Sequence, residues 1–170
     1  MQNHSEFYSH VEAFAANALK PGAMERERTG EIPHELIREL GDAGLLAVNV
    51  AEELGGKGAG VVAYANAVKR VAMADASIAV TMAVPNMVGE VIQQFGTEAQ
   101  KHQYCPKLAS GEFFAGAFAL SEPGSGSDAA SLQTKAVRDG DDWIINGQKL
   151  WITSGTHAGV FVVWARTSGS

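Results

Sequence analysis

The hydrophobic pattern of this 170-residue chain changes its period near Gly111. Before that residue, apolar side chains recur every three or four positions, which is the spacing of one face of an amphipathic helix. After it come short apolar or alternating runs separated by turn residues, which are typical of β-strands. The sequence therefore predicts an α+β protein, with a helical domain over 1–111 and an incomplete antiparallel β domain over 112–170.

Five helices are predicted before the change of period. Pro21-Gly22 is expected to end the first helix, and Pro85 to kink the fourth, which is almost wholly apolar and should be buried. Thr97 and Gln100 have the spacing of a capping box, so they should begin the fifth. The helices are expected at about 7–18, 33–41, 61–74, 77–95 and 98–109.

The C-terminal part is predicted to form an antiparallel meander of about five strands. Residues 139–142, with the sequence DGDD, are expected to form one turn. Asn146-Gly147 favours a two-residue hairpin turn of the primed type. The strands are expected at about 113–121, 132–138, 143–145, 148–154 and 159–166. So small a sheet would leave an open edge.

Composition argues against several classes of function. A net charge of −6 is unlike that of a nucleic-acid-binding surface, and no stretch is apolar and long enough to span a bilayer. The five histidines are scattered along the chain, so no metal site is expected. The N-terminus lacks the features of a secretory signal. The single cysteine, Cys105, excludes an internal disulfide, and a cytoplasmic location is expected.

The stretch 119–131, ALSEPGSGSDAAS, is the candidate functional loop. Gly124 and Gly126 allow a ligand to approach the backbone, and the serines, Ser121 among them, add hydroxyl groups. Loops of this composition hold phosphate-bearing cofactors, although a plain surface turn explains the composition equally well. A Rossmann fingerprint is excluded, because the segments that follow look like antiparallel strands and not like a helix.

The chain resembles the N-terminal part of the acyl-CoA dehydrogenases. The stretch 119–131 satisfies the first signature of that family, and 144–155, IINGQKLWITSG, matches its second characteristic stretch at the expected distance. The run 96–101 and the nearby Pro106 and Leu108 also fit the family. The resemblance covers almost all of this chain but only about half of a typical member. It implies a helical domain, a middle β domain and a C-terminal four-helix domain, the last absent here.

The resemblance also implies FAD-dependent dehydrogenation of an acyl-CoA thioester between Cα and Cβ, in fatty acid or amino acid catabolism. The residues that it places at the flavin are Phe118, Leu120, Ser121, Gly126, Ser127, Trp151, Ile152 and Thr153. Those that it places near the acyl-CoA are Ser127, Val80, Ala83 and Met87. An electron-transferring flavoprotein is the implied acceptor, and the implied assembly is a homo-oligomer, a tetramer in the full-length form.

Taken singly, these residues have plainer explanations. A tryptophan such as Trp151 in an alternating strand is more often a core side chain, and so are the three apolar residues on one face of the fourth helix. The catalytic glutamate of the family lies in its C-terminal domain. Neither Glu122 nor Asp128 matches it, so no catalytic residue is assigned, and the chain alone is expected to be inactive.

Two alternatives to a dehydrogenase stay open at this point. A related flavin enzyme, such as an acyl-CoA oxidase or a flavin-dependent monooxygenase, would share the motifs but react with oxygen. A non-catalytic interaction protein could keep only the helical domain and a partial β domain, and it would hold no flavin.

Overall fold

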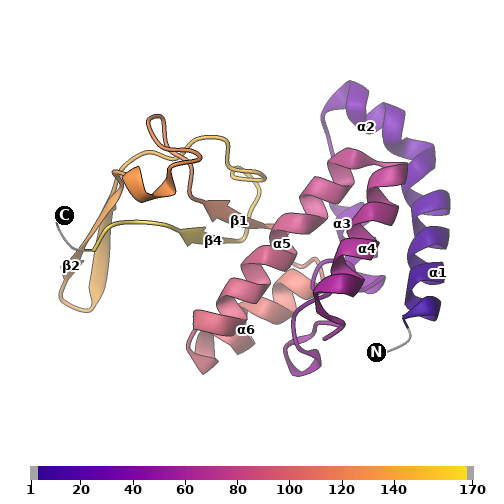
Figure 1. The fold of residues 1–170 in the computed structure, drawn as a ribbon, viewed down its shortest axis with the longest axis horizontal. Coiled ribbons are helices and arrows are strands. Elements are labelled where there is room, and N and C mark those ends of the chain that lie inside the picture. Colours follow the sequence, from indigo (N-terminus) through magenta and orange to yellow (C-terminus); the bar gives the residue numbers. More distant parts are fainter. Residues whose placement is uncertain (1–3, 168–170) are drawn as a thin grey trace.

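A bundle of helices carries a smaller β region on one side in the computed structural model, which describes residues 4–167 (Figure 1). The predicted α+β architecture is confirmed. The α-helices are α1 (Ser5–Phe14), α2 (Ala23–Thr29), α3 (His34–Asp42), α4 (Gly60–Ala74), α5 (Ala76–Phe95) and α6 (Glu98–Ala109). The capping box of α6 is present, with Thr97 accepting from the backbone N–H of Gln100 and the Gln100 side chain accepting in return.

The predicted end of the first helix at Pro21-Gly22 is wrong. After α1 the chain continues through a π-helical turn, Ala15–Leu19, and a 3₁₀ turn, Lys20–Gly22, into α2. Pro21 lies in the first positions of the 3₁₀ turn, where its missing N–H breaks no helical hydrogen bond. The helical path ends only at Gly30, which adopts the left-handed conformation.

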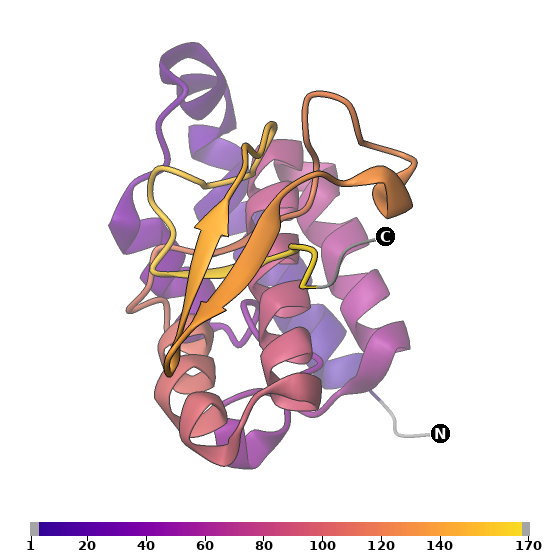
Figure 2. The ribbon, with the colours of Figure 1, turned by 90° about the vertical axis from the view of Figure 1, so that its left-hand side faces the viewer.

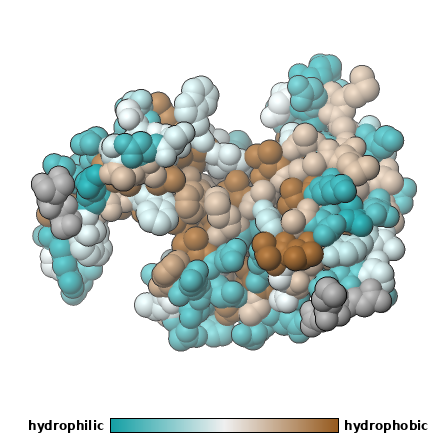
Figure 3. Space-filling model, in the orientation of Figure 1, coloured by the Kyte–Doolittle hydropathy of each residue, from teal (hydrophilic) through white to brown (hydrophobic). Residues whose placement is uncertain are grey.

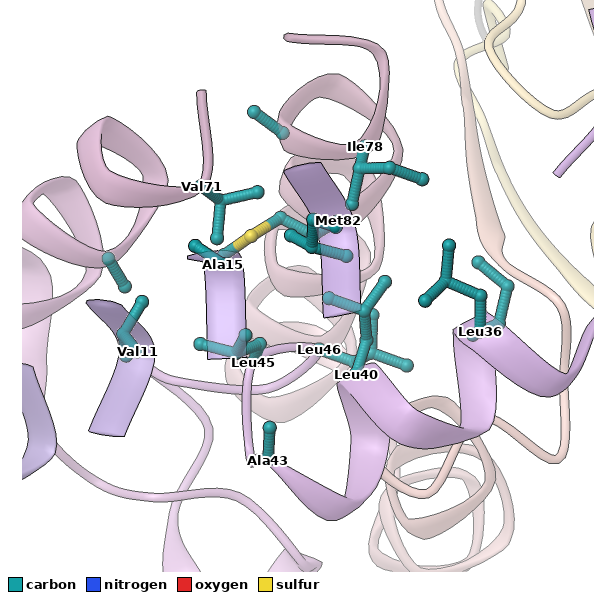
Figure 4. Packing of buried hydrophobic residues seen from close by; sticks show 14 residues of the cluster. Val11, Ala15, Leu36, Leu40, Ala43, Leu45, Leu46, Val71, Ile78 and Met82 are labelled. Atoms are coloured by element: carbon teal, nitrogen blue, oxygen red, sulfur yellow. The ribbon is translucent and has the colours of Figure 1, made fainter. Parts of the chain in front are cut away.

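The helical core lies where α1, α3, α4 and α5 meet (Figure 4). Its side chains include Leu40, Leu45 and Met82, each with no exposed surface. Burial of side chains of this size stabilises a fold by about 1.5–3 kcal/mol each. α5 runs through Pro85 and is the buried helix that the sequence predicts.

The β region contains four short strands. β1 (Gly116–Ala119) pairs in parallel with β4 (Val160–Val163), whereas β2 (Lys135–Asp139) and β3 (Asp142–Asn146) form an antiparallel hairpin. The β1–β4 pair lies between α5 and the hairpin (Figure 1), and the hairpin stands nearest the viewer in Figure 2. Phe118, Val160 and Val162 pack against the second apolar cluster, on α5 and α6.

The prediction of a continuous antiparallel meander is therefore wrong in three places. β4 returns to β1 after a long connection and runs parallel to it. The turn predicted over 139–142 is confirmed, with Gly140 at a φ of 61°, but Asn146-Gly147 follows the hairpin and does not form the predicted turn. The predicted strand 148–154 is irregular, because part of its backbone is left-handed and its hydrogen bonds go to loops.

β1 approaches α5 closely. A Cβ atom on Gly116 would lie 2.8 Å from the side chain of Val88 in α5, which is too close for any residue but glycine. This contact fixes the first strand, and with it the start of the loop 119–131, against the buried helix.

Candidate functional site

The loop after β1 is folded tightly on itself. Glu122 and Ser125 exchange backbone hydrogen bonds of 2.7 and 3.1 Å, so Pro123-Gly124 forms the tip of a turn. The Ser125 hydroxyl then donates to the carbonyl oxygen of Asp128 at 2.6 Å. These bonds give the signature stretch a defined shape without help from a ligand.

The folded chain does not require glycine, in place of a larger residue, at Gly124 or Gly126 of this loop. A Cβ atom on Gly124 or Gly126 would meet no heavy atom within 4 Å, and neither residue has a positive φ. Both lie on exposed backbone beside serine hydroxyls. Since packing and turn geometry would accept alanine, the bare backbone suits close approach by a phosphate-bearing ligand, and the loop therefore fits such a cofactor.

Glu122 is buried at the centre of this loop. Its Oε1 accepts from Lys149 Nζ at 2.7 Å and from the Thr134 N–H at 2.9 Å, and its Oε2 accepts from the Gln133 N–H. The Lys149 ammonium, helped by these hydrogen bonds, lowers the pKa of the Glu122 carboxyl to about 2. The carboxylate therefore serves as an acceptor that joins segments, since it is too weak a base to take a proton near neutral pH.

The second motif lies alongside the first. Lys149 Nζ also donates to the Leu120 carbonyl at 3.0 Å, and the Leu150 N–H donates to the Ser121 carbonyl at 2.9 Å. Gly147 passes so close to Thr134 that a Cβ atom there would lie 2.3 Å from the threonine hydroxyl oxygen. The tertiary fold thus brings together two stretches that are well separated in sequence.

The backbone is strained where the second motif is most exposed. Trp151 and Ser154 have φ values of 60° and 59°, and they are the only non-glycine residues with positive φ among those described. Three backbone hydrogen bonds hold the strained segment. The Ile152 carbonyl accepts from the Gly155 N–H, and the Ser154 carbonyl accepts from the N–H groups of His157 and Ala158. Backbone strain of this kind costs about 1–3 kcal/mol per residue and clusters at functional sites.

The proposed flavin residues lie in both segments. Phe118 is in β1, half-buried, with its ring 5.8 Å from that of Trp164. Trp151 is 93% exposed, so the interpretation of it as a core side chain is wrong. The remaining proposed flavin residues differ in exposure. Four are half-buried, namely Leu120, Ser121, Ile152 and Thr153, and two are exposed, namely Gly126 and Ser127.

The three proposed acyl-CoA residues of the helical part lie on a different element, α5. Val80 is 55% and Met87 39% exposed, and Ala83 is half-buried. The interpretation of this helix face as core is therefore wrong. The surface is hollowed between the β region and the helices, with hydrophobic side chains exposed nearby (Figure 3).

Sequence reasoning missed the pair formed by Glu122 and Lys149. Both residues lie within the two motif stretches, but the sequence alone does not show that they meet. The available signal was a charged residue inside each small or apolar stretch, where a charge is unfavourable unless it is paired.

Over residues 4–167, no group of three or more histidine, cysteine, aspartate or glutamate side chains is placed to hold a metal ion. Among the helices of the same residues, none has the length and hydropathy needed to cross a membrane.

Two models of one protein family match this chain, one after the other. The family model described as acyl-CoA dehydrogenase, N-terminal domain, matches residues 1–112, and that described as acyl-CoA dehydrogenase, middle domain, matches residues 117–170. An acyl-CoA dehydrogenase of Bacillus subtilis is 42% identical over 159 residues, which are 93% of this chain and 42% of that protein.

Solved structures show the same fold. A glutaryl-CoA dehydrogenase from Mycobacterium smegmatis in complex with FADH2 has a TM-score of 0.92 at 34% identity, over 98% of this chain and 43% of that one. Butyryl-CoA dehydrogenase from Megasphaera elsdenii has a TM-score of 0.88 at 35% identity, over 99% and 45%. The chain thus spans less than half the length of these relatives. With both family models matched in order, the chain belongs to the acyl-CoA dehydrogenase family.

Proposed function

We propose that the protein is an FAD-dependent acyl-CoA dehydrogenase, and that this chain supplies its helical domain, 1–111, and the flavin-facing part of its middle domain, 112–170. The observation that carries the proposal is the joining of the two motif segments. Ser121 and Leu150 are hydrogen-bonded backbone to backbone, and the strained, exposed Trp151 follows directly.

The residues proposed to hold FAD divide by chemistry. Gly126 and Ser127 offer open backbone and a hydroxyl for the pyrophosphate. Ser121 and Thr153 offer hydroxyl groups for the polar edge of the ring system, and Trp151 offers an aromatic face. The apolar side chains of Phe118, Leu120 and Ile152 are proposed to pack around the flavin ring system. When bound, FAD accepts the β hydrogen of the substrate as hydride, and donors near its ring stabilise the charge that develops.

Neither carboxylate of the loop 119–131 is assigned as the acceptor of the Cα proton under the proposal. Glu122 is bonded to an ammonium and to two backbone N–H groups, with a pKa of about 2. The Asp128 carboxylate accepts from the Ser131 hydroxyl. A general base works best with a pKa near the operating pH, so we assign the base to a carboxylate outside these 170 residues.

For the acyl-CoA we propose the exposed face of α5 together with Ser127. Val80, Ala83 and Met87 present small or flexible apolar side chains that are not used in the core. An acyl chain laid against them would be removed from water, while the Ser127 hydroxyl would serve the polar part of the thioester ligand.

The remaining features of the proposal concern the whole protein. We propose an electron-transferring flavoprotein as the acceptor, a homo-oligomeric assembly that is tetrameric in the full-length form, and a place in fatty acid or amino acid catabolism, as the family resemblance implies. A cytoplasmic location is supported by the lone Cys105, which is a buried free thiol with a pKa raised by burial.

Purification of the complete natural protein tests the proposal. We expect a yellow protein whose flavin, released on denaturation, is FAD, and whose visible absorbance bleaches on anaerobic addition of an acyl-CoA. Rapid oxygen consumption by the reduced protein would instead indicate an oxidase or monooxygenase. A protein that binds no flavin from solution would contradict the proposal.

A further inference from the structure

The ion pair of Glu122 and Lys149 does more than neutralise two charges. Together with the groups they bond, which are the Leu120 carbonyl and the N–H groups of Gln133 and Thr134, they form what we call the 122–149 clasp. One carboxylate and one ammonium thereby fasten three segments that lie 11 to 29 residues apart.

The clasp is enclosed, unlike most ion pairs of the described residues. The side chains of Glu122 and Lys149 are 4% and 11% exposed. The pair of Lys101 and Glu98 on α6 has a similar length, 2.8 Å, but leaves the carboxylate open to water. A buried pair adds little net stability compared with apolar side chains of similar volume, so its presence points to control of geometry.

A comparison within the chain sharpens this point. Arg26 and Asp75 form another buried pair, at 2.8 Å, and Asp75 also caps α5 by accepting from the Ile78 N–H. That pair joins helices and has an evident architectural use. The 122–149 clasp joins only loops and a strand end, and two of its three segments, those of Glu122 and Lys149, adjoin residues proposed to touch the flavin.

Glu122 and Lys149 lie within two residues of such groups in the sequence. The carbonyl oxygens of Leu120 and Ser121 accept hydrogen bonds from Lys149 Nζ and from the Leu150 N–H. Trp151, with its unfavourable φ of 60°, comes next in the chain. A backbone conformation that costs energy is kept only when its surroundings hold it, and here the preceding residues are held by the clasp.

We propose that the 122–149 clasp is a positioning device, which sets Ser121 and Trp151 relative to each other and so fixes the environment of the flavin ring. This inference rests on the proposed function. Lys149 and Glu122 are positioning residues in it, and neither touches the ligand.

The variant Lys149→Met in the complete natural protein tests the inference, with Lys101→Met as the matched control. The control removes a lysine from an ion pair of similar length on α6, far from the loop in sequence. Both variants are loaded with FAD. The readouts are the visible circular dichroism of the bound flavin, its reduction potential, and kcat and KM for the acyl-CoA.

We expect Lys149→Met to change the flavin dichroism and potential and to lower kcat about a hundredfold, as misplacement by about 1 Å does, with KM close to that of wild type. Lys101→Met should match wild type in every readout. Bound flavin with wild-type dichroism and potential in Lys149→Met would overturn the clasp, even if less flavin is bound, because loss of stability alone lowers occupancy and leaves the spectrum unchanged.

If Lys149→Met does not fold, Lys149→Arg decides the question. It keeps the positive charge but displaces the donors, so the clasp predicts a folded protein with altered flavin dichroism, and an unaltered spectrum would overturn it. A wild-type protein that binds no FAD overturns the proposed function and the clasp together, whereas a flavin-loaded wild type with unchanged variants overturns the clasp alone.

Discussion

Asn86, in the middle of α5, offers a sharp test of what holds the helical core together. Its side chain is 1% exposed. The Oδ1 atom accepts from the Val48 N–H at 2.6 Å, and Nδ2 donates to the carbonyl oxygens of Leu45 and Met82 at 2.7 and 2.8 Å. Asn86 thus fastens the start of the loop after α3 to α5. We predict that the substitution Asn86→Leu destabilises the protein severely.

The magnitude follows from the groups left without partners. Leucine has the same branching and the same number of side-chain heavy atoms as asparagine, although its methyl groups are bulkier, so the loss counted here is that of hydrogen bonding. Val48 and Leu45 are both fully buried, and a buried polar group without a partner costs about 1–3 kcal/mol. Two such groups, at about 2 kcal/mol each, lower the free energy of unfolding by about 4 kcal/mol. That is a large part of the 5–15 kcal/mol, roughly, that stabilises a domain.

Urea denaturation of the wild-type and variant proteins measures the loss, and hydrogen exchange at the Val48 amide locates it. The matched control is Asn66→Leu on α4, where the side chain is part-exposed and donates to the Val62 carbonyl within its own helix. We expect a change of about 0.5 kcal/mol or less there. A loss under about 1 kcal/mol in Asn86→Leu, with unchanged exchange at Val48, would refute the reasoning.

Three further predictions concern the candidate site. Gly147→Ala should lower the melting temperature, because the new Cβ would lie 2.3 Å from the Thr134 hydroxyl oxygen. A cost of about 1–3 kcal/mol is expected, and an unchanged melting temperature would contradict the close approach. Trp151→Ala should leave the melting temperature almost unchanged, because the side chain is 93% exposed. The same variant should bind FAD more weakly, as measured by flavin fluorescence. Equal affinity for FAD would count against the proposed role of Trp151. The pKa of Glu122 is lowered to about 2 from an ordinary 4.5, so its contribution to stability is complete above pH 4.5 and is lost as the pH falls toward 2. Acid denaturation of the wild-type protein and of Lys149→Met measures this loss of stability. The variant lacks the partner ammonium, so it should lose the contribution of Glu122 at a higher pH. Identical acid transitions would contradict the lowered pKa of Glu122.

The helices were predictable because their signals are local. Apolar spacing and a capping box act over one or two turns, and the structure follows them at α3 to α6. The prediction failed at Pro21-Gly22, because a proline at the start of a 3₁₀ turn continues a helical path as readily as it ends one.

The strand partners were not predictable in the same way. An alternating run such as 148–154 has the right pattern for a strand, but a strand also needs an edge to pair with, and the nearest backbone acceptors were carbonyls of the loop after β1. Likewise, nothing local in the runs that became β1 and β4 tells whether they will pair in parallel.

The candidate site divides along the same line. Two motifs and their spacing are enough to assign the family from the residues alone, and with it the residues proposed to bind flavin. Three features depend on the fold: Glu122 and Lys149 meet in a buried pair, Trp151 is exposed on strained backbone, and the Val80 face of α5 is open. Local periodicity reports the next few residues, whereas burial, strain and ion pairing depend on segments brought together across long stretches of chain.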